Sequence, residues 1–180
     1  AATGNTETFG MIADQIDAHN EFHGGQVGLM ADMHRGSFFA EITGKAALGT
    51  NFEMVRRDGQ TNLITGAYPV PLLQSYHGGM FVQGSNLGQY TKAVFAVVPE
   101  AICKVGLKFS DRSRFYIGYN FLYLSNAVRP GDQIDRSVNP TQIPLVAGAG
   151  PYVGPVRPQA TFVHSDFWVQ GLVIGFESRF

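Results

Sequence analysis

The sequence predicts an all-β protein: an antiparallel up-and-down transmembrane β-barrel, of which this chain is the C-terminal part. Several stretches alternate apolar and polar residues, so that each strand has two unlike faces. Only 15% of the residues are charged, against about 25% in soluble domains. Short turns alternate with long loops along the chain, and transmembrane barrels show the same asymmetry between their two ends.

The composition narrows the function classes. Thirteen basic and fourteen acidic residues give a net charge of -1, which provides no electrostatic basis for a nucleic-acid partner. Cys103 is the only cysteine, so an intrachain disulfide is impossible. No apolar run approaches the roughly 20 residues of a membrane-spanning helix. A soluble β-sandwich with one solvated face fits the composition equally well.

The first predicted strands form a hairpin. Residues 1 to about 20 are expected to be a loop, and alternation begins at Glu21. A tight turn at Arg35-Gly36-Ser37 leads into the second strand, which starts at Phe38. The second strand has the clearest pattern, with Phe38, Ala40, Ile42, Ala46 and Leu48 on one face and Glu41, Thr43 and Lys45 on the other.

Two more strands are separated from the first pair by a long loop at residues 50–89, which shows no sustained period. The third strand runs from about Tyr90 to Phe109, and Pro99 is expected to mark a bulge or kink because it lacks a backbone N–H. A short turn follows, and the fourth strand continues to Tyr123. The apolar face comprises Phe95, Val97, Ala101, Cys103, Val105, Leu107, Phe109, Phe115, Ile117, Tyr119, Phe121 and Tyr123.

A second long loop at residues 126–160 precedes the final strand, Phe162 to Phe180. Gln170 interrupts its apolar parity, so a bulge near Gln170-Gly171 is expected. The ending resembles the C-terminal assembly signal of bacterial outer-membrane barrels, although Ser178 departs from the usual apolar pattern. This resemblance implies recognition by the barrel assembly machinery through Phe180, Phe176, Ile174 and Leu172.

If the apolar parity faces outer-membrane lipid, the opposite parity lines the lumen. A charge that faces lipid at the bilayer midplane costs about 2–4 kcal/mol, and the sequence places its strand charges on the other face. The predicted lumen-lining residues are Glu41, Lys45, Glu100, Lys104, Lys108, Arg114 and Tyr116, with Glu177 and Arg179 on the same parity.

Five predicted strands cannot close a barrel, since bacterial single-chain barrels use an even number of eight or more. We therefore expect residues 1–180 to be one barrel domain or part of one, completed by an upstream part of the polypeptide. Shared barrels built from several copies are an alternative. A closed eight-stranded barrel, with further strands at residues 5–18 and 60–84, would overturn both.

The run GYNFLYLSNAVRPGDQIDRSVNP, residues 118–140, resembles a bacterial family of beta-barrel porins, the seventh class of that name. Further matches are FAVVPE (95–100), GGQVGL (24–29), KAALG (45–49) and DFWVQGL (166–172). The resemblance spans roughly residue 20 to the end and implies a barrel in the bacterial outer membrane, with the C-terminus in the periplasm.

The predicted function is passive transport of small solutes. The alternatives are a closed structural barrel that displays its loops to other surface proteins, and a soluble ligand-binding β-protein. An enzyme is not expected, because no catalytic constellation is present, and neither a cofactor nor a metal is expected. His19 and His23 would share a metal only on a helix. Asp132 and Asp135 are interpreted as a polar turn, with an Asp135/Arg136 charge pair, rather than a calcium site.

Overall fold

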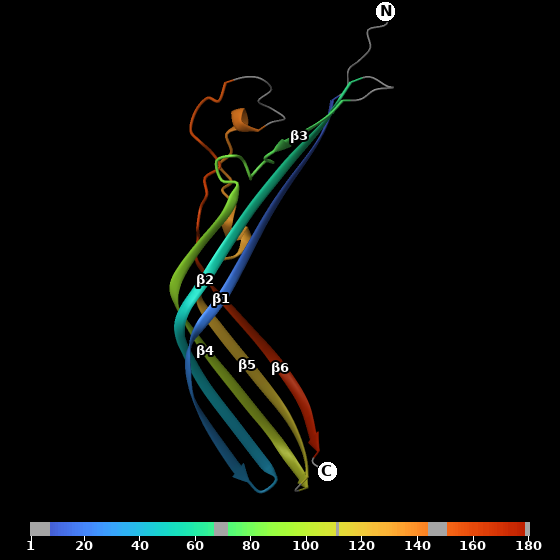
Figure 1. Cartoon of the computed structure of the whole chain (residues 1–180). Coiled ribbons are helices and arrows are strands. Elements are labelled where there is room, and N and C mark those ends of the chain that lie inside the picture. The colour runs from blue at the N-terminus through green and yellow to red at the C-terminus, as the bar shows by residue number, and fades with distance from the viewer. Residues whose placement is uncertain (1–7, 67–71, 111, 144–150, 179–180) are drawn as a thin grey trace, which may run out of the picture. The chain divides into compact units, whose positions relative to one another are not determined.

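The computed structural model describes residues 8–66, 72–110, 112–143 and 151–178. Nearly all of the regular structure is β (Figure 1). The elements are β1 (Thr8–Arg35), β2 (Phe38–Thr65), β3 (Leu72–His77), β4 (Gly88–Ser110), β5 (Ser113–Ala127), the 3-10 turns η1 (Pro130–Gln133) and η2 (Pro140–Gln142), and β6 (Ser165–Ser178).

The six strands form one sheet in the order β1-β2-β4-β5-β6, with β3 paired to β2. The pairs β2–β3, β4–β5 and β5–β6 are antiparallel. The predicted all-β antiparallel architecture is therefore confirmed. The sheet is open in the described part of the chain, with β1 and β6 at its two edges.

The strand limits correct two predictions. The segment before Glu21, expected to be a loop, belongs to β1 from Thr8 onward. The expected loop at 50–89 contains the rest of β2, up to Thr65, and the whole of β3. Residues 5–18 and 60–84 are where the alternative expects further strands. Parts of both stretches are in strands, because β1 begins at Thr8 and residues 60–84 contain the end of β2 and the whole of β3. No helix among the described residues is long and apolar enough to cross a membrane.

The chain divides into two compact units. The loop unit comprises Ala1–His19, Glu53–Lys92 and Val128–His164, and the sheet unit comprises Asn20–Phe52, Ala93–Ala127 and Ser165–Phe180. Strands β1, β2 and β4 contribute residues to both units. Within the sheet unit, five strands run side by side (Figure 1).

One face of the sheet unit is apolar and uncovered. Its large side chains are strongly exposed, as shown by Leu29 at 85%, Leu172 at 77% and Phe109 at 68%. The described strands form a single sheet, with no second layer over this face. Within the described residues, the apolar parity is thus not buried between sheets as a soluble β-protein would require. A contiguous exposed apolar surface of this kind needs lipid or a partner.

The apolar face ends where the loop unit begins. On β2 the exposed parity is apolar from Phe38 to Phe52, with Gly44 and Thr50 as exceptions, and then turns polar at Arg56, Asp58 and Gln60. The stretch before the change exceeds the roughly 9–11 residues that a tilted strand needs to cross a bilayer. The loop-unit part of β2 lacks this apolar parity.

The bulge expected near Gln170-Gly171 is absent. The register of β5 with β6 is continuous from Ser113↔Ser178 to Leu124↔Phe167, and it shifts only beyond Leu124. Gln170 therefore stays on the apolar face with Trp168 and Leu172. The hydroxyl of Tyr119 donates a hydrogen bond to Gln170 Oε1, so the amide is accommodated by pairing rather than by a change of face.

The bulge or kink expected at Pro99 stays a prediction. Strand β4 continues through this residue, and its register with β5 starts just after it, at Glu100↔Leu122. Beyond the proline, side chains take over part of the pairing. Val97 N donates to Ser125 Oγ at 2.8 Å, and Asn126 Nδ2 donates to Phe95 O at 3.0 Å.

Candidate functional site

The polar face of the sheet unit is built on a row of alternating aromatic and glycine residues. Gly106 of β4 pairs with Tyr116 of β5, and Tyr116 pairs with Gly175 of β6. A Cβ atom on Gly106 would lie 2.6 Å from the ring of Phe39 on β2, and one on Gly175 would collide with the ring of Tyr116. Each ring thus covers the glycine of the next strand, which fixes the ring and fills the space left by the missing side chain.

A cation lies on each of these rings. The Arg114 guanidinium is 5.1 Å from the centre of the Phe39 ring, and the Lys104 ammonium is 5.2 Å from the centre of the Tyr116 ring. Such contacts are worth about 0.5–1 kcal/mol when partly exposed. The aromatic row therefore orients two of the predicted lumen-lining cations along the polar face.

Arg114 joins three strands through two carboxylates. Its Nη1 lies 2.8 Å from Glu41 Oε1 of β2, and its Nη2 lies 2.7 Å from Glu177 Oε2 of β6. The register places Glu177 directly opposite Arg114. The side chains of Arg114 and Glu41 are only 26% and 19% exposed, so solvent screens this pair less than an open surface pair.

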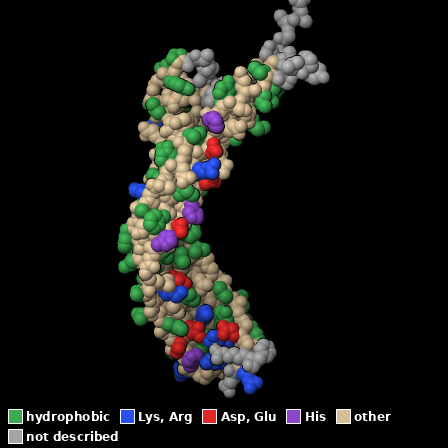
Figure 2. All heavy atoms as spheres, viewed as in Figure 1, with side chains coloured by type: hydrophobic (Ala, Val, Ile, Leu, Met, Phe, Trp, Pro, Cys, Tyr) green, Lys and Arg blue, Asp and Glu red, His purple; other side chains and the backbone are tan. Residues whose placement is uncertain are grey.

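A second ion pair connects β2 and β4 on the same face. Lys45 Nζ lies 3.1 Å from Glu100 Oε2, with 32% and 22% of the two side chains exposed. Lys108 is opposite Arg114 in the register of β4 and β5. Figure 2 shows acidic and basic side chains next to one another over the sheet. The structure thus brings Glu41, Arg114 and Glu177 into one cluster, Lys45 and Glu100 into another, and Lys104 and Tyr116 into a stacked pair.

In the loop unit, the corresponding parity of β2 is covered by the segment between β5 and β6. Glu53, Val55, Arg57 and Thr61 are at most 2% exposed. Arg57 Nη2 donates to the carbonyl oxygens of Gln133 and Thr161, and its guanidinium lies 5.3 Å from the Tyr90 ring centre. The described parts of this segment, residues 128–143 and 151–164, are therefore anchored on this side of β2.

A second anchor joins the end of that segment to two strands. Glu53 Oε1 of β2 lies 3.2 Å from His164 Nδ1, and His164 Nε2 lies 3.3 Å from Lys92 Nζ of β4. The lysine can only donate, so His164 Nε2 accepts and His164 Nδ1–H donates to the carboxylate. Gln133, which is fully buried, completes the attachment by exchanging two hydrogen bonds with the backbone of Val163.

Asp135 fixes the interior of the same segment. Its carboxylate accepts hydrogen bonds from the backbone N–H groups of Gln159 at 2.8 Å and Ser137 at 2.9 Å, and from Arg157 Nη1 at 2.9 Å. These backbone donors, followed by the arginine, lower the pKa of Asp135 to about 2. The predicted partner, Arg136, is thus wrong, and the actual partner is Arg157.

The residues of the predicted assembly signal lie on β6, except for Phe180, which is outside the described residues. Leu172, Ile174 and Phe176 are 77%, 71% and 64% exposed on the apolar face. Opposite them in β5 stand Tyr119, Ile117 and Phe115. Arg179 also lies outside the described part of the chain.

Sequence reasoning missed several residues that shape the polar face. Phe39 and Gly106 show no signal alone, because their significance depends on the register between β2 and β4. Glu53 and Arg57 fell in a predicted loop. Asn51, Glu53, Arg57 and Thr61 are polar residues that share one side of the strand, which is a possible signal. The residues on the other side are not consistently apolar, however, so the usual strand pattern is missing.

Within the described ranges, no group of three His, Cys, Asp or Glu side chains could hold a metal ion.

Comparison with known proteins gives one match. The family model described as "Putative beta barrel porin-7 (BBP7)" matches residues 1–180. No curated protein and no solved structure matches the chain.

Proposed function

Because the chain belongs to the beta barrel porin-7 family, and is thus a porin-like outer-membrane protein, we propose that it forms a passive channel for small solutes. The observation that carries this proposal is the division of the sheet unit into two faces. Large apolar side chains are exposed on one face, whereas the charged residues of β2, β4, β5 and β6 form ion pairs on the other. A strand that separates lipid from a water-filled lumen requires this arrangement.

The proposed pore wall is formed by Glu41, Lys45, Glu100, Lys104, Lys108, Arg114 and Tyr116. Both signs of charge are present, so strong selectivity between cations and anions is not expected. Lys45 offsets Glu100, and Arg114 together with Lys108, opposite it in the register, balances the charges of Glu41 and Glu177. Solutes in this lumen would meet a polar wall with little local excess of charge near these pairs.

The orientation is also proposed. Barrels of this kind have short periplasmic turns and longer extracellular loops. The β1–β2 turn at Gly36-Ser37 would then be periplasmic, together with the C-terminus, and residues 128–164 would face outward. Leu172, Ile174 and Phe176 would serve as the sequence read by the barrel assembly machinery. Labelling of an epitope tag between Gly36 and Ser37 in intact cells would contradict this orientation.

A closed, structural barrel that interacts with other surface proteins is the second candidate. It is favoured by the same ion pairs, because side chains that satisfy one another can also seal an interior. Conductance in planar bilayers separates the two. The channel proposal predicts ohmic steps from the folded protein as extracted in detergent from the outer membrane. Folded and inserted protein that remains electrically silent would favour the closed barrel.

A further inference from the structure

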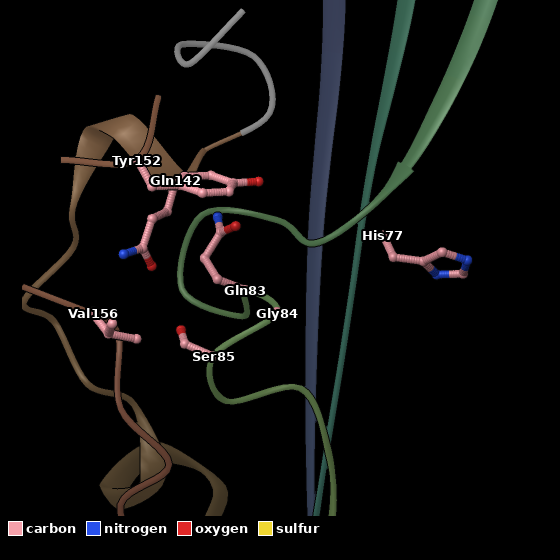
Figure 3. A pocket seen from close by; sticks show the side chains of 7 residues that line it. All are labelled: His77, Gln83, Gly84, Ser85, Gln142, Tyr152 and Val156. Atoms are coloured by element: carbon pink, nitrogen blue, oxygen red, sulfur yellow. The ribbon is translucent and has the colours of Figure 1, made fainter. Parts of the chain in front are cut away.

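The loop unit contains a cavity of about 370 Å³, and we propose that it binds a neutral saccharide. Its lining includes Gln83, Ser85, Gln142, Tyr152 and Val156 (Figure 3). The volume lies in the lower part of the range for small-molecule sites, about 300–1,000 Å³. The inference does not depend on conduction, since a channel and a closed barrel could both carry this site.

The first wall is the segment around Tyr152, which is held in place by Asn139 and by the Thr141 hydroxyl, itself hydrogen-bonded to the backbone of Val153. Asn139 is 8% exposed and donates through Nδ2 to Val153 O at 2.7 Å and to Pro155 O at 2.8 Å. Its Oδ1 accepts hydrogen bonds from the backbone and the hydroxyl of Thr141. Tyr152 and Val156 are therefore held against η2, which carries Gln142.

The second wall is the loop between β3 and β4, and it too is fixed before any ligand arrives. The Asp14 carboxylate of β1 accepts three backbone hydrogen bonds, each 3.0 Å long, from Met80, Phe81 and Val82. Asn86 bridges the loop by accepting from Gln83 N at 2.8 Å and by donating to Phe81 O at 3.0 Å. The backbone that presents Gln83 and Ser85 is thus preorganised, which lowers the entropic cost of binding.

The two walls are joined directly. Ser85 Oγ donates a 2.7 Å hydrogen bond to Pro158 O, two residues beyond Val156. In Figure 3 the side chains of Tyr152, Gln142, Gln83, Ser85 and Val156 surround a common space, whereas His77 points away from it. The cavity is a defined space between two loops of one compact unit.

The chemistry of the lining identifies the class of ligand. Apart from His77, whose ring points away from the cavity, the described lining residues carry no carboxylate and no ionisable nitrogen, so little compensates a charged ligand. Tyr152 is 78% exposed, which leaves an aromatic ring for stacking on the C–H face of a sugar ring. Gln142 uses one amide hydrogen on Pro155 O at 3.4 Å and retains a carbonyl oxygen and a second hydrogen for ligand hydroxyls.

The test is an array of immobilised neutral oligosaccharides (glucans, galactans, mannans and N-acetylated glycans), probed with the full chain in detergent. Uronic-acid counterparts serve as charged comparisons. We expect binding to at least one neutral glycan, with weaker binding to its charged counterpart. Tyr152→Ala should weaken binding about tenfold, because it removes the stacking surface.

Val153→Ala is the matched control, since Val153 is 62% exposed in the same segment but does not line the cavity. Gln142→Ala alters the same wall through a different side chain and provides a second test if Tyr152→Ala does not fold. Circular dichroism establishes that each variant retains its strands. The proposal is overturned if no neutral glycan binds, or if binding survives both substitutions unchanged in folded protein.

Discussion

Replacing one apolar-face residue by arginine provides the sharpest test of where lipid lies. Val105 is on the apolar face of β4 and is 49% exposed in the isolated chain. If water covered this face, Val105→Arg would change the unfolding free energy by about 0.5 kcal/mol or less. If lipid covers it near the bilayer midplane, the cost is about 2–4 kcal/mol, which lowers the folding equilibrium constant by about 30-fold to nearly 1,000-fold.

Ile102→Arg is the matched control. Ile102 lies three positions away on the same strand but on the polar face, opposite Asn120 and on the same parity as Glu100 and Lys104. An arginine there reaches the proposed lumen, so the expected cost is below about 1 kcal/mol. Guanidinium unfolding in lipid vesicles measures both variants through Trp168, the single tryptophan. Equal costs for the two substitutions would refute the assignment of the faces.

Three further predictions follow from the polar contacts. Arg114→Ala should lower the free energy of unfolding by about 1–2 kcal/mol, because two partly exposed ion pairs and a ring contact are lost. A change below about 0.3 kcal/mol in chemical denaturation would mean that the Glu41–Arg114–Glu177 cluster does not stabilise the fold. The pKa of Asp135 lies below its usual value, at about 2. The stability that the ionised carboxylate gives to its loop is therefore complete above about pH 4 and is lost as the pH falls toward 2. Amide hydrogen exchange in this loop should accelerate over that pH window, and Asp135→Asn should remove most of the pH dependence. Asp14→Ala should speed hydrogen exchange at the three amides that it accepts, whereas unchanged exchange would mean that other contacts hold the loop.

The faces of the strands could be predicted because a period of two is visible wherever one face is consistently apolar. Phe38 to Leu48 and Ala101 to Phe109 show this pattern, and the structure exposes the large apolar side chains of both runs. The same reasoning failed beyond Phe52. There, one parity of β2 is buried and polar, as at Glu53 and Arg57, and the other is exposed and polar, so hydrophobicity does not alternate.

The partners of the charged residues could not be predicted, because a sequence pattern gives the face of a residue but not the register of its strand. Arg114 and Glu177 are 63 residues apart, and only the β5–β6 register brings them together. From the sequence alone a bulge is expected at Gln170, because this amide shares the apolar parity of Trp168 and Leu172. The sequence contains a partner for this amide, Tyr119, but only the register places it within reach.

Cysteine modification during conductance recording tests the central claim most directly, that the polar face of the sheet lines a water-filled passage. Cys103→Ser first removes the native thiol, and Lys104→Cys and Val105→Cys then place a thiol on each face of β4. The account predicts that a charged methanethiosulfonate reagent changes the conductance of Lys104→Cys and leaves that of Val105→Cys unchanged. An unaltered conductance after modification at position 104, or a change through position 105, would contradict it.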